Sequence, residues 1–130
     1  MESFTINQVF PVKAKKLFKA WLSSKMHGQM TGSKAEIEPV VDGKFDIWDG
    51  YITGNTIQLV QDEKIVQKWR TTEFPKGAPD SLLTLEFKAH EKGTDLILTH
   101  SEIPDGQGDQ YKQGWIDYYF EPMKDYFARG

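Results

Sequence analysis

The side chains best suited to acid–base chemistry are three histidines, and only one of them lies in an apolar setting. His100 alternates with Leu96 and Leu98 along residues 95–103, so its ring faces the same side as two leucines. An imidazole there could act as a general base or as a polar anchor for a ligand. The alternative is a core histidine bonded to a tyrosine or a backbone group, and no sequence-local acid partner supports catalysis.

The sequence offers little else for covalent or metal chemistry. His27 and His90 lie in or beside polar turns, where we expect them to be solvated, and the three histidines lack the spacing of metal ligands. The absence of cysteine excludes disulfides and thiolate metal sites. Phosphate-binding glycine loops and the hydrolase nucleophile elbow are both missing. Residues 105–109 do not match a calcium loop, and we expect them to form a flexible hinge at the cavity entrance. We therefore expect no metal and no cofactor, and binding rather than catalysis.

The stretch from Asp109 to Arg129 organises the rest of the chain. On a helical wheel its apolar residues form one arc of roughly 200°, about twice the width that an ordinary surface helix needs. Such a helix must be covered on two flanks, so we expect it to lie across the mouth of a curved sheet, above a cavity or a thick core. Pro122 removes the backbone bond to the carbonyl of Tyr118, which predicts a kink over residues 118–122. The arc consists of Tyr111, Trp115, Ile116, Tyr118, Tyr119, Phe120, Met123, Tyr126 and Phe127.

Composition limits the class of protein. The 130 residues suffice for a single domain spanning 1–130. A net charge of −3 argues against a broad nucleic-acid surface. No apolar run approaches a membrane span, and the N-terminus lacks the apolar core of a signal peptide, so we expect a cytoplasmic protein.

The remaining elements follow from periodicity. Alternation around Phe4, Ile6 and Val9 predicts a strand, and residues 11–22 and 25–30 predict two short helices, the first opening at Pro11. Turn signals then separate six short alternating segments, and Pro39 predicts that residues 35–41 form an edge strand. The order of strand, two helices, six strands and a long helix predicts an α+β fold with a curved antiparallel sheet of about six or seven strands.

Two side chains on these segments have ambiguous surroundings. Strict alternation points Trp48 outward, although a bulge near Gly50 could turn it inward. Arg70 faces away from Trp69, and we expect it to form a salt bridge or an edge hydrogen bond.

Several phrases of the sequence also resemble a known family. They are residues 9–21, the Asp42-Gly-Lys-Phe45 turn, residues 65–70, 81–87 and 94–104, and the Gly114-Trp-Ile-Asp-Tyr-Tyr119 segment with Pro122 and Tyr126. In this order the chain is similar to the START-like superfamily, and within it to the family of the activator of the ninety-kilodalton heat-shock chaperone's ATPase. The resemblance implies a helix-grip fold, with a hydrophobic cavity under the C-terminal helix that can hold a lipid, sterol or polyketide. A heat-shock chaperone is the alternative partner that it implies, and a cofactor-free lyase or cyclase using His100 is a further alternative.

The cavity hypothesis names nine residues that would line a site for a small hydrophobic molecule. The alternative is that they fill an ordinary core, with Gln67 as an internal polar handle. Tyr111 and Tyr118 could also hold ligand hydroxyls, although helix packing explains them equally. The nine are Trp21, Phe45, Gln67, Trp69, Phe87, His100, Trp115, Tyr119 and Met123.

The first predicted helix carries a stripe of lysines opposite its apolar face. Lys13, Lys15, Lys16 and Lys19 either form a solvated surface or dock an acidic partner such as a chaperone.

Overall fold

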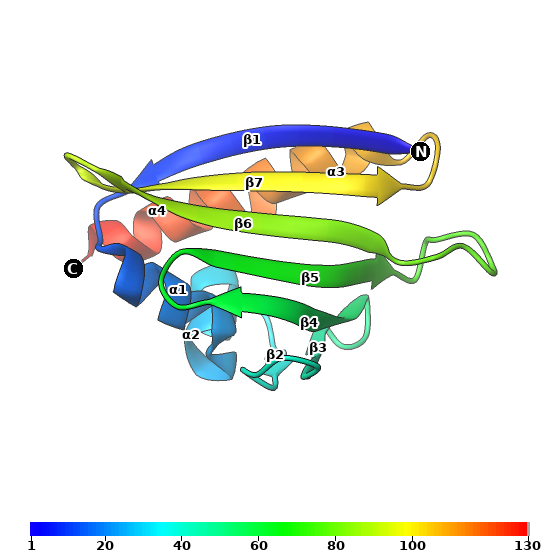
Figure 1. Ribbon diagram of the computed structural model, residues 1–130, viewed down its shortest axis with the longest axis horizontal. Coiled ribbons are helices and arrows are strands. Elements are labelled where there is room, and N and C mark those ends of the chain that lie inside the picture. Colours follow the sequence, from blue (N-terminus) through cyan, green and yellow to red (C-terminus); the bar gives the residue numbers. More distant parts are fainter. Residues whose placement is uncertain (130) are drawn as a thin grey trace.

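The computed structural model describes residues 1–129 as one curved antiparallel sheet that holds a long C-terminal helix on its concave side (Figure 1). The seven strands lie in the order β1-β7-β6-β5-β4-β3-β2. Their bounds are β1 (Glu2–Phe10), β2 (Ala35–Ile37), β3 (Lys44–Ile47), β4 (Ile52–Val60), β5 (Lys64–Thr71), β6 (Ser81–His90) and β7 (Gly93–Ile103). The helix-grip α+β fold expected from the sequence is therefore confirmed.

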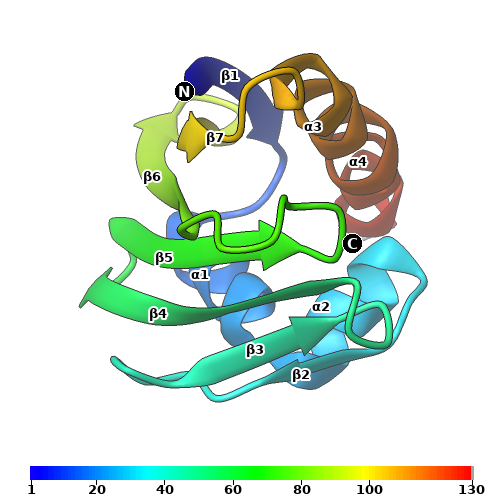
Figure 2. The same cartoon turned by 90° about the vertical axis from the view of Figure 1, so that its right-hand side faces the viewer.

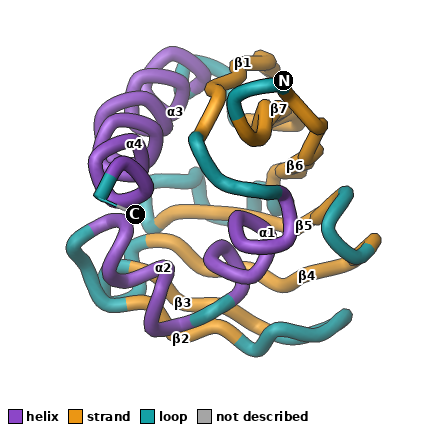
Figure 3. Tube along the Cα trace, turned by 90° about the vertical axis from the view of Figure 1, so that its left-hand side faces the viewer, coloured by secondary structure: helices purple, strands orange, loops and turns teal. Residues whose placement is uncertain are grey.

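Helices α1 (Ala14–Leu22) and α2 (Ser24–Thr31) form the connection between β1 and β2. Seen along the long axis of the molecule, the terminal helix lies against one flank of the curved sheet while α1 and α2 lie beneath it (Figures 2 and 3). The side chain of Ser23 caps α2 by accepting a bond from the Met26 N–H, and Gly32 ends that helix in the left-handed conformation.

The predicted start of the first helix at Pro11 is wrong. Pro11 and Val12 form a bend, because the Val12 N–H bonds back to the Phe10 carbonyl at 2.9 Å. The hydroxyl of Thr94 holds this bend by donating to the Val12 carbonyl at 2.7 Å, so α1 begins only at Ala14.

The terminal helix runs as three consecutive pieces rather than as one regular helix. They are α3 (Gly108–Gly114), the π-helical turn η1 (Trp115–Phe120) and α4 (Glu121–Ala128). In η1 the Glu121 N–H bonds to the carbonyl of Ile116, five residues earlier. The widened turn stands just before Pro122, where the sequence predicts a kink, because Pro122 cannot donate to the Tyr118 carbonyl.

The loop before this helix is tied down more firmly than the sequence suggests. The carboxylate of Glu2 accepts bonds from the N–H groups of Gly106 at 2.9 Å and Gly108 at 2.7 Å. Residues 105–109 were expected to be a flexible hinge, but these bonds fasten the start of α3 to β1.

The core is a continuous apolar cluster between the sheet, the terminal helix and α1. Leu83, Leu85, Leu96 and Leu98 on β6 and β7 are fully buried, and Met123 of α4 is buried with them. None of the helices within residues 1–129 is long and apolar enough to cross a membrane.

The close contact between β4 and β5 depends on Gly54. A Cβ at Gly54 would lie 1.9 Å from the Lys68 carbonyl oxygen and 2.6 Å from Phe45 Cζ. We expect Gly54→Ala to lower the free energy of unfolding by about 2 kcal/mol or more, as measured by chemical denaturation. Gly114→Ala is the matched control, because a Cβ there meets only Tyr118 Cδ2 at 3.9 Å, and it should preserve stability. Equal stability of the two variants would contradict this account of the β4–β5 contact.

Candidate functional site

An aromatic pocket of about 190 Å³ opens between the β3–β4 turn and the terminal helix. The turn and β4 provide one wall, Trp69 of β5 lies behind it, and α3 with η1 provides the other wall. The lining residues are Trp48, Tyr51, Ile52, Trp69, Gln110, Tyr111, Gly114, Trp115, Tyr118 and Tyr119.

The β3–β4 turn places Trp48 in this wall through an unusual backbone. Trp48, Asp49 and Gly50 have φ values of 59°, 52° and 86°, so three consecutive residues are left-handed. The Asp46 carboxylate holds the turn by accepting from the Gly50 N–H at 2.7 Å, and the Trp48 N–H donates to the Lys34 carbonyl at 3.0 Å. Alternation alone would point Trp48 outward, so the inward orientation follows from the turn.

The π-turn supplies the opposite wall. Trp115 and Tyr119 are buried with ring centroids 4.7 Å apart, whereas Tyr118 stands at the mouth with 59% of its surface exposed. Such wide turns recur at functional sites, because they aim neighbouring side chains in directions that a regular helix does not allow.

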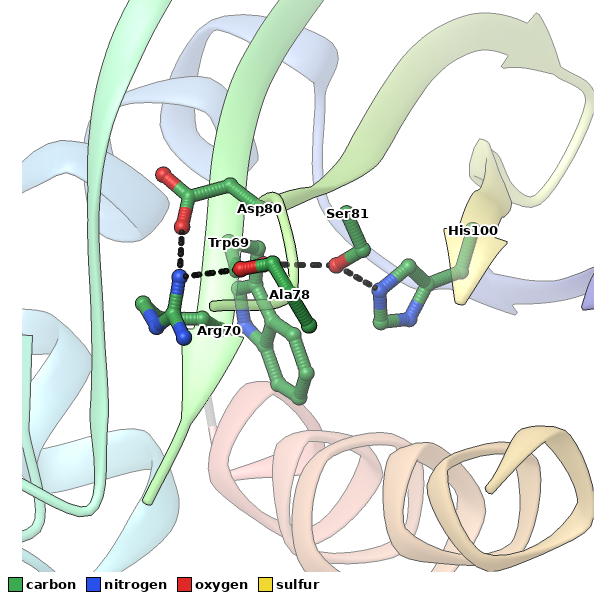
Figure 4. Close-up of polar contacts among 6 residues, drawn as sticks. All are labelled: Trp69, Arg70, Ala78, Asp80, Ser81 and His100. Carbon is green, nitrogen blue, oxygen red and sulfur yellow. Dashed lines mark hydrogen bonds and ion pairs between the residues drawn. The ribbon is translucent and has the colours of Figure 1, made fainter. Parts of the chain in front are cut away.

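His100 does not line the pocket, and both of its ring nitrogens form hydrogen bonds, one of them with Ser81 (Figure 4). The Trp115 indole N–H donates to His100 Nδ1 at 3.1 Å, and His100 Nε2 lies 2.8 Å from Ser81 Oγ. Ser81 Oγ in turn donates to the Trp69 carbonyl at 2.6 Å, so Nε2 carries the imidazole proton. Burial lowers the pKa of His100 to about 3. With both nitrogens bonded and no place in the pocket wall, the ring is a structural connector, which gives no support to a lyase or cyclase reaction.

His27 is buried, and its expected solvation is wrong. Only 1% of the residue is exposed. Its Nδ1 lies 2.8 Å from the Trp21 carbonyl and its Nε2 lies 2.7 Å from the Tyr119 hydroxyl, so Nδ1 donates and Nε2 accepts. Burial lowers the pKa of His27 to about 4 and raises the pKa of Tyr119. The sequence carried one sign of this burial, because the apolar residue Met30 lies three positions after His27 on the same helical face.

The structure divides the nine predicted cavity residues into two groups. Trp69, Trp115 and Tyr119 line the pocket. The other six are buried in the packed core: Trp21, Phe45, Gln67, Phe87, His100 and Met123. Gln67 is the internal polar handle that was expected, because it donates to Thr56 Oγ1 at 3.1 Å and accepts from the Trp21 indole at 3.5 Å.

The wall residues outside those nine come mainly from the β3–β4 turn and α3. Tyr111 and Tyr118 were considered as ligand contacts, and Trp48 was left with two orientations. Tyr51, Ile52, Gln110 and Gly114 carried no sequence signal, since their role depends on how the turn meets α3.

Arg70 forms the predicted salt bridge. Its guanidinium donates to the Asp80 carboxylate at 2.8 Å and to the Ala78 carbonyl at 3.0 Å, which fixes the loop between β5 and β6 (Figure 4).

The exposed surface of α1 and of the residue before it carries four lysines. Lys13, Lys15, Lys16 and Lys19 are all exposed, and none of them forms a salt bridge with residues 1–129. The sequence from Ser3 to Ala35 contains no acidic residue. We call these four side chains the α1 lysine surface.

A curved sheet gripping a kinked aromatic helix, with a small pocket at the side, defines a helix-grip protein. The family model for activator of Hsp90 ATPase homolog 1-like protein matches residues 11–128. The chain belongs to this family.

Relatives agree over nearly the whole chain. The human activator of 90 kDa heat shock protein ATPase homolog 1 is 30% identical over 126 residues, which are 97% of this chain and 37% of that protein. The chain thus spans little more than a third of this relative. The crystal structure of an HSP90 activator from Plasmodium falciparum is 28% identical in sequence and superposes with a TM-score of 0.89. The match covers 98% of this chain and 97% of that one. The Aha1 dimer from Colwellia psychrerythraea is 12% identical with a TM-score of 0.81, covering 98% of this chain and 96% of that one, and shares the fold.

The two buried histidines make stability depend on pH. Their folded-state pKa values of about 4 and about 3 lie below the ordinary 6.5, so the unfolded chain takes up protons first as the pH falls. The stabilisation is complete above pH 6.5 and declines as the pH falls below it. We expect each histidine to remove about 2 kcal/mol from the free energy of unfolding between pH 7 and pH 5.

Denaturation curves at the two pH values, for the wild type and for His27→Gln, measure this effect. The variant should lose roughly half of the pH-dependent change. His90→Gln, at the exposed end of β6, is the matched control and should keep it. A free energy of unfolding that stays constant from pH 7 to pH 5 would contradict the neutral, bonded state of both rings.

Proposed function

We propose that the chain is an accessory protein of an Hsp90-type chaperone and raises the ATPase rate of that chaperone. The observation that carries the proposal is the similarity to proteins named as activators of this ATPase, which extends over 97% of the chain. The Plasmodium activator supports it further, because that protein matches this chain along almost its full length.

Such a protein can accelerate hydrolysis only by binding one chaperone conformation more tightly than another. A ligand with equal affinity for both states shifts neither, however tightly it binds. The accessory protein must therefore recognise the hydrolysis-competent arrangement of the chaperone through a surface of its own.

The α1 lysine surface is our candidate for that contact. Its four ammonium groups lack acidic partners within residues 1–129, so they attract an acidic patch without first breaking an internal pair. Contacts of this kind weaken as salt rises, because the Debye length falls to roughly 8 Å at physiological ionic strength.

Charge reversal tests the proposal. We expect Lys15→Glu with Lys19→Glu to reduce stimulation of the cognate chaperone's ATPase by about tenfold or more and to weaken binding in calorimetry. Lys76→Glu with Lys112→Glu is the matched control, since both lysines are exposed elsewhere and the change in net charge is the same. Full stimulation by the α1 variant would remove this surface from the proposal. No stimulation and no heat of binding by the wild-type chain would remove the chaperone function itself.

We infer a second function from the aromatic pocket, namely binding of a small apolar molecule. Its 190 Å³ lies below the roughly 300–1,000 Å³ of sites for drug-sized ligands. It exceeds the roughly 150 Å³ of an apolar cavity that takes up benzene. The size favours one or two fused rings, and only part of a sterol or lipid would fit inside.

Chemical-shift mapping with a panel of such compounds tests the second function. We expect resonances of Trp48 and Tyr118 to move on titration, while those of Phe87 and Met123 in the packed core stay in place. A panel of bicyclic aromatics, short fatty acids and flavonoids that moves none of the pocket resonances would exclude it.

A further inference from the structure

Three of the four tyrosine hydroxyls around the pocket are already used within the protein. Tyr51 donates to the Glu73 carboxylate, and Tyr119 bonds to His27 at 2.7 Å. Tyr111 donates to Gln107 Oε1 at 2.7 Å and lies 2.6 Å from Thr71 Oγ1. Since these groups hold the walls together, a ligand would have to break internal bonds in order to use them.

The buried indole N–H of Trp48 has no such internal hydrogen bond. Trp48 Nε1 is buried and has no hydrogen-bond partner among residues 1–129, and it is the only buried side-chain nitrogen or oxygen in that state over this range. A buried donor without an acceptor costs roughly 1–3 kcal/mol, and the left-handed backbone of Trp48 adds roughly 1–2 kcal/mol. Two unfavourable features thus coincide at one residue of the pocket wall. Features of this kind cluster at functional sites.

The aromatic rings of Tyr51, Tyr118 and Tyr119 surround Trp48 in the pocket wall. Its ring stacks on Tyr51 with the two planes 14° apart, and Tyr118 meets it edge to face at 5.8 Å. Tyr118 is 59% exposed, so it can turn outward without uncovering the core. An outward turn of Tyr118 is the movement that a contact between the indole N–H and a molecule in the pocket would require.

We propose that the pocket takes a flat, uncharged aromatic molecule of one or two rings that carries a hydrogen-bond acceptor, and that Trp48 Nε1 donates to this acceptor. The inference rests on the ligand-binding function proposed above and narrows its ligand class. The acceptor is a ring nitrogen or a carbonyl oxygen, since both present a lone pair in the plane of a flat molecule.

The charge of the surroundings supports an uncharged ligand. No Lys or Arg lines the pocket. The carboxylate of Glu73 bonds to two groups of the wall, the Tyr51 hydroxyl and Gln110 Nε2. A carboxylate or phosphate ligand would therefore be repelled there and would lose its hydration without gaining a cation.

Two probes of nearly identical shape isolate the hydrogen bond. Quinoline carries a ring nitrogen as acceptor, whereas naphthalene has none, and each has two fused rings. We expect the ratio of their dissociation constants, naphthalene over quinoline, to fall by about tenfold in Trp48→Phe relative to wild type. Because the ratio is compared between proteins, the different hydration of the two probes cancels.

Tyr118→Phe is the matched control, because it removes only a hydroxyl from the same wall, and it should keep the wild-type ratio. A ratio that falls in Tyr118→Phe but not in Trp48→Phe would overturn the assignment of the donor. An unchanged ratio in Trp48→Phe would overturn the inference while leaving ligand binding intact, and failure of both probes to bind would overturn both.

A second measurement on the wild type keeps the test independent of the variant's folding. The indole N–H resonance of Trp48 should shift downfield with quinoline and not with naphthalene. A resonance that responds equally to the two probes would contradict the proposed bond.

Discussion

Two neutral imidazoles fasten the terminal helix to the rest of the molecule. His100 on β7 accepts from Trp115, and His27 on α2 accepts from the hydroxyl of Tyr119. One bond joins the helix to the sheet and the other joins it to the helical pair. Each imidazole N–H also donates a hydrogen bond, that of His100 to Ser81 Oγ and that of His27 to the Trp21 carbonyl. Neither ring can therefore take up a second proton without losing the bond that its other nitrogen accepts.

These bonds also fix the tautomers of the two rings in opposite senses. His100 carries its proton on Nε2 because the Trp115 N–H donates to Nδ1, and His27 carries its proton on Nδ1 because the Trp21 carbonyl there can only accept. Both donors lie on the same side of the helix, because Trp115 and Tyr119 are four residues apart within the π-turn. Helix geometry, tautomers and the sequence around Pro122 are therefore parts of one arrangement, and the pocket lies beside it.

Periodicity was enough to predict the architecture. The broad apolar arc of residues 109–129 indicated a helix covered on two sides, and alternation along residues 95–103 correctly placed the ring of His100 inside. The elements are local patterns whose burial follows from repeat length, so they can be inferred from neighbours in sequence. The family resemblance then agreed with the fold.

The pocket could not be predicted in the same way. Trp48 faces inward because three successive residues adopt a left-handed backbone, a choice that alternation does not encode. His27 is buried because it meets Tyr119, which is 92 residues away in sequence. Whether aromatic rings fill a space or leave one open depends on such distant meetings, so the residue types of a core and of a cavity wall look alike in the sequence.

The placement of α1 has a consequence for simultaneous occupancy. Helix α1 lies toward one end of the long axis, whereas the β3–β4 turn and α3 lie toward the other (Figure 1). A macromolecule seated on α1 would therefore leave the pocket mouth unobstructed, and the two occupants need not compete for space. Any thermodynamic communication between them would have to pass through the body of the protein.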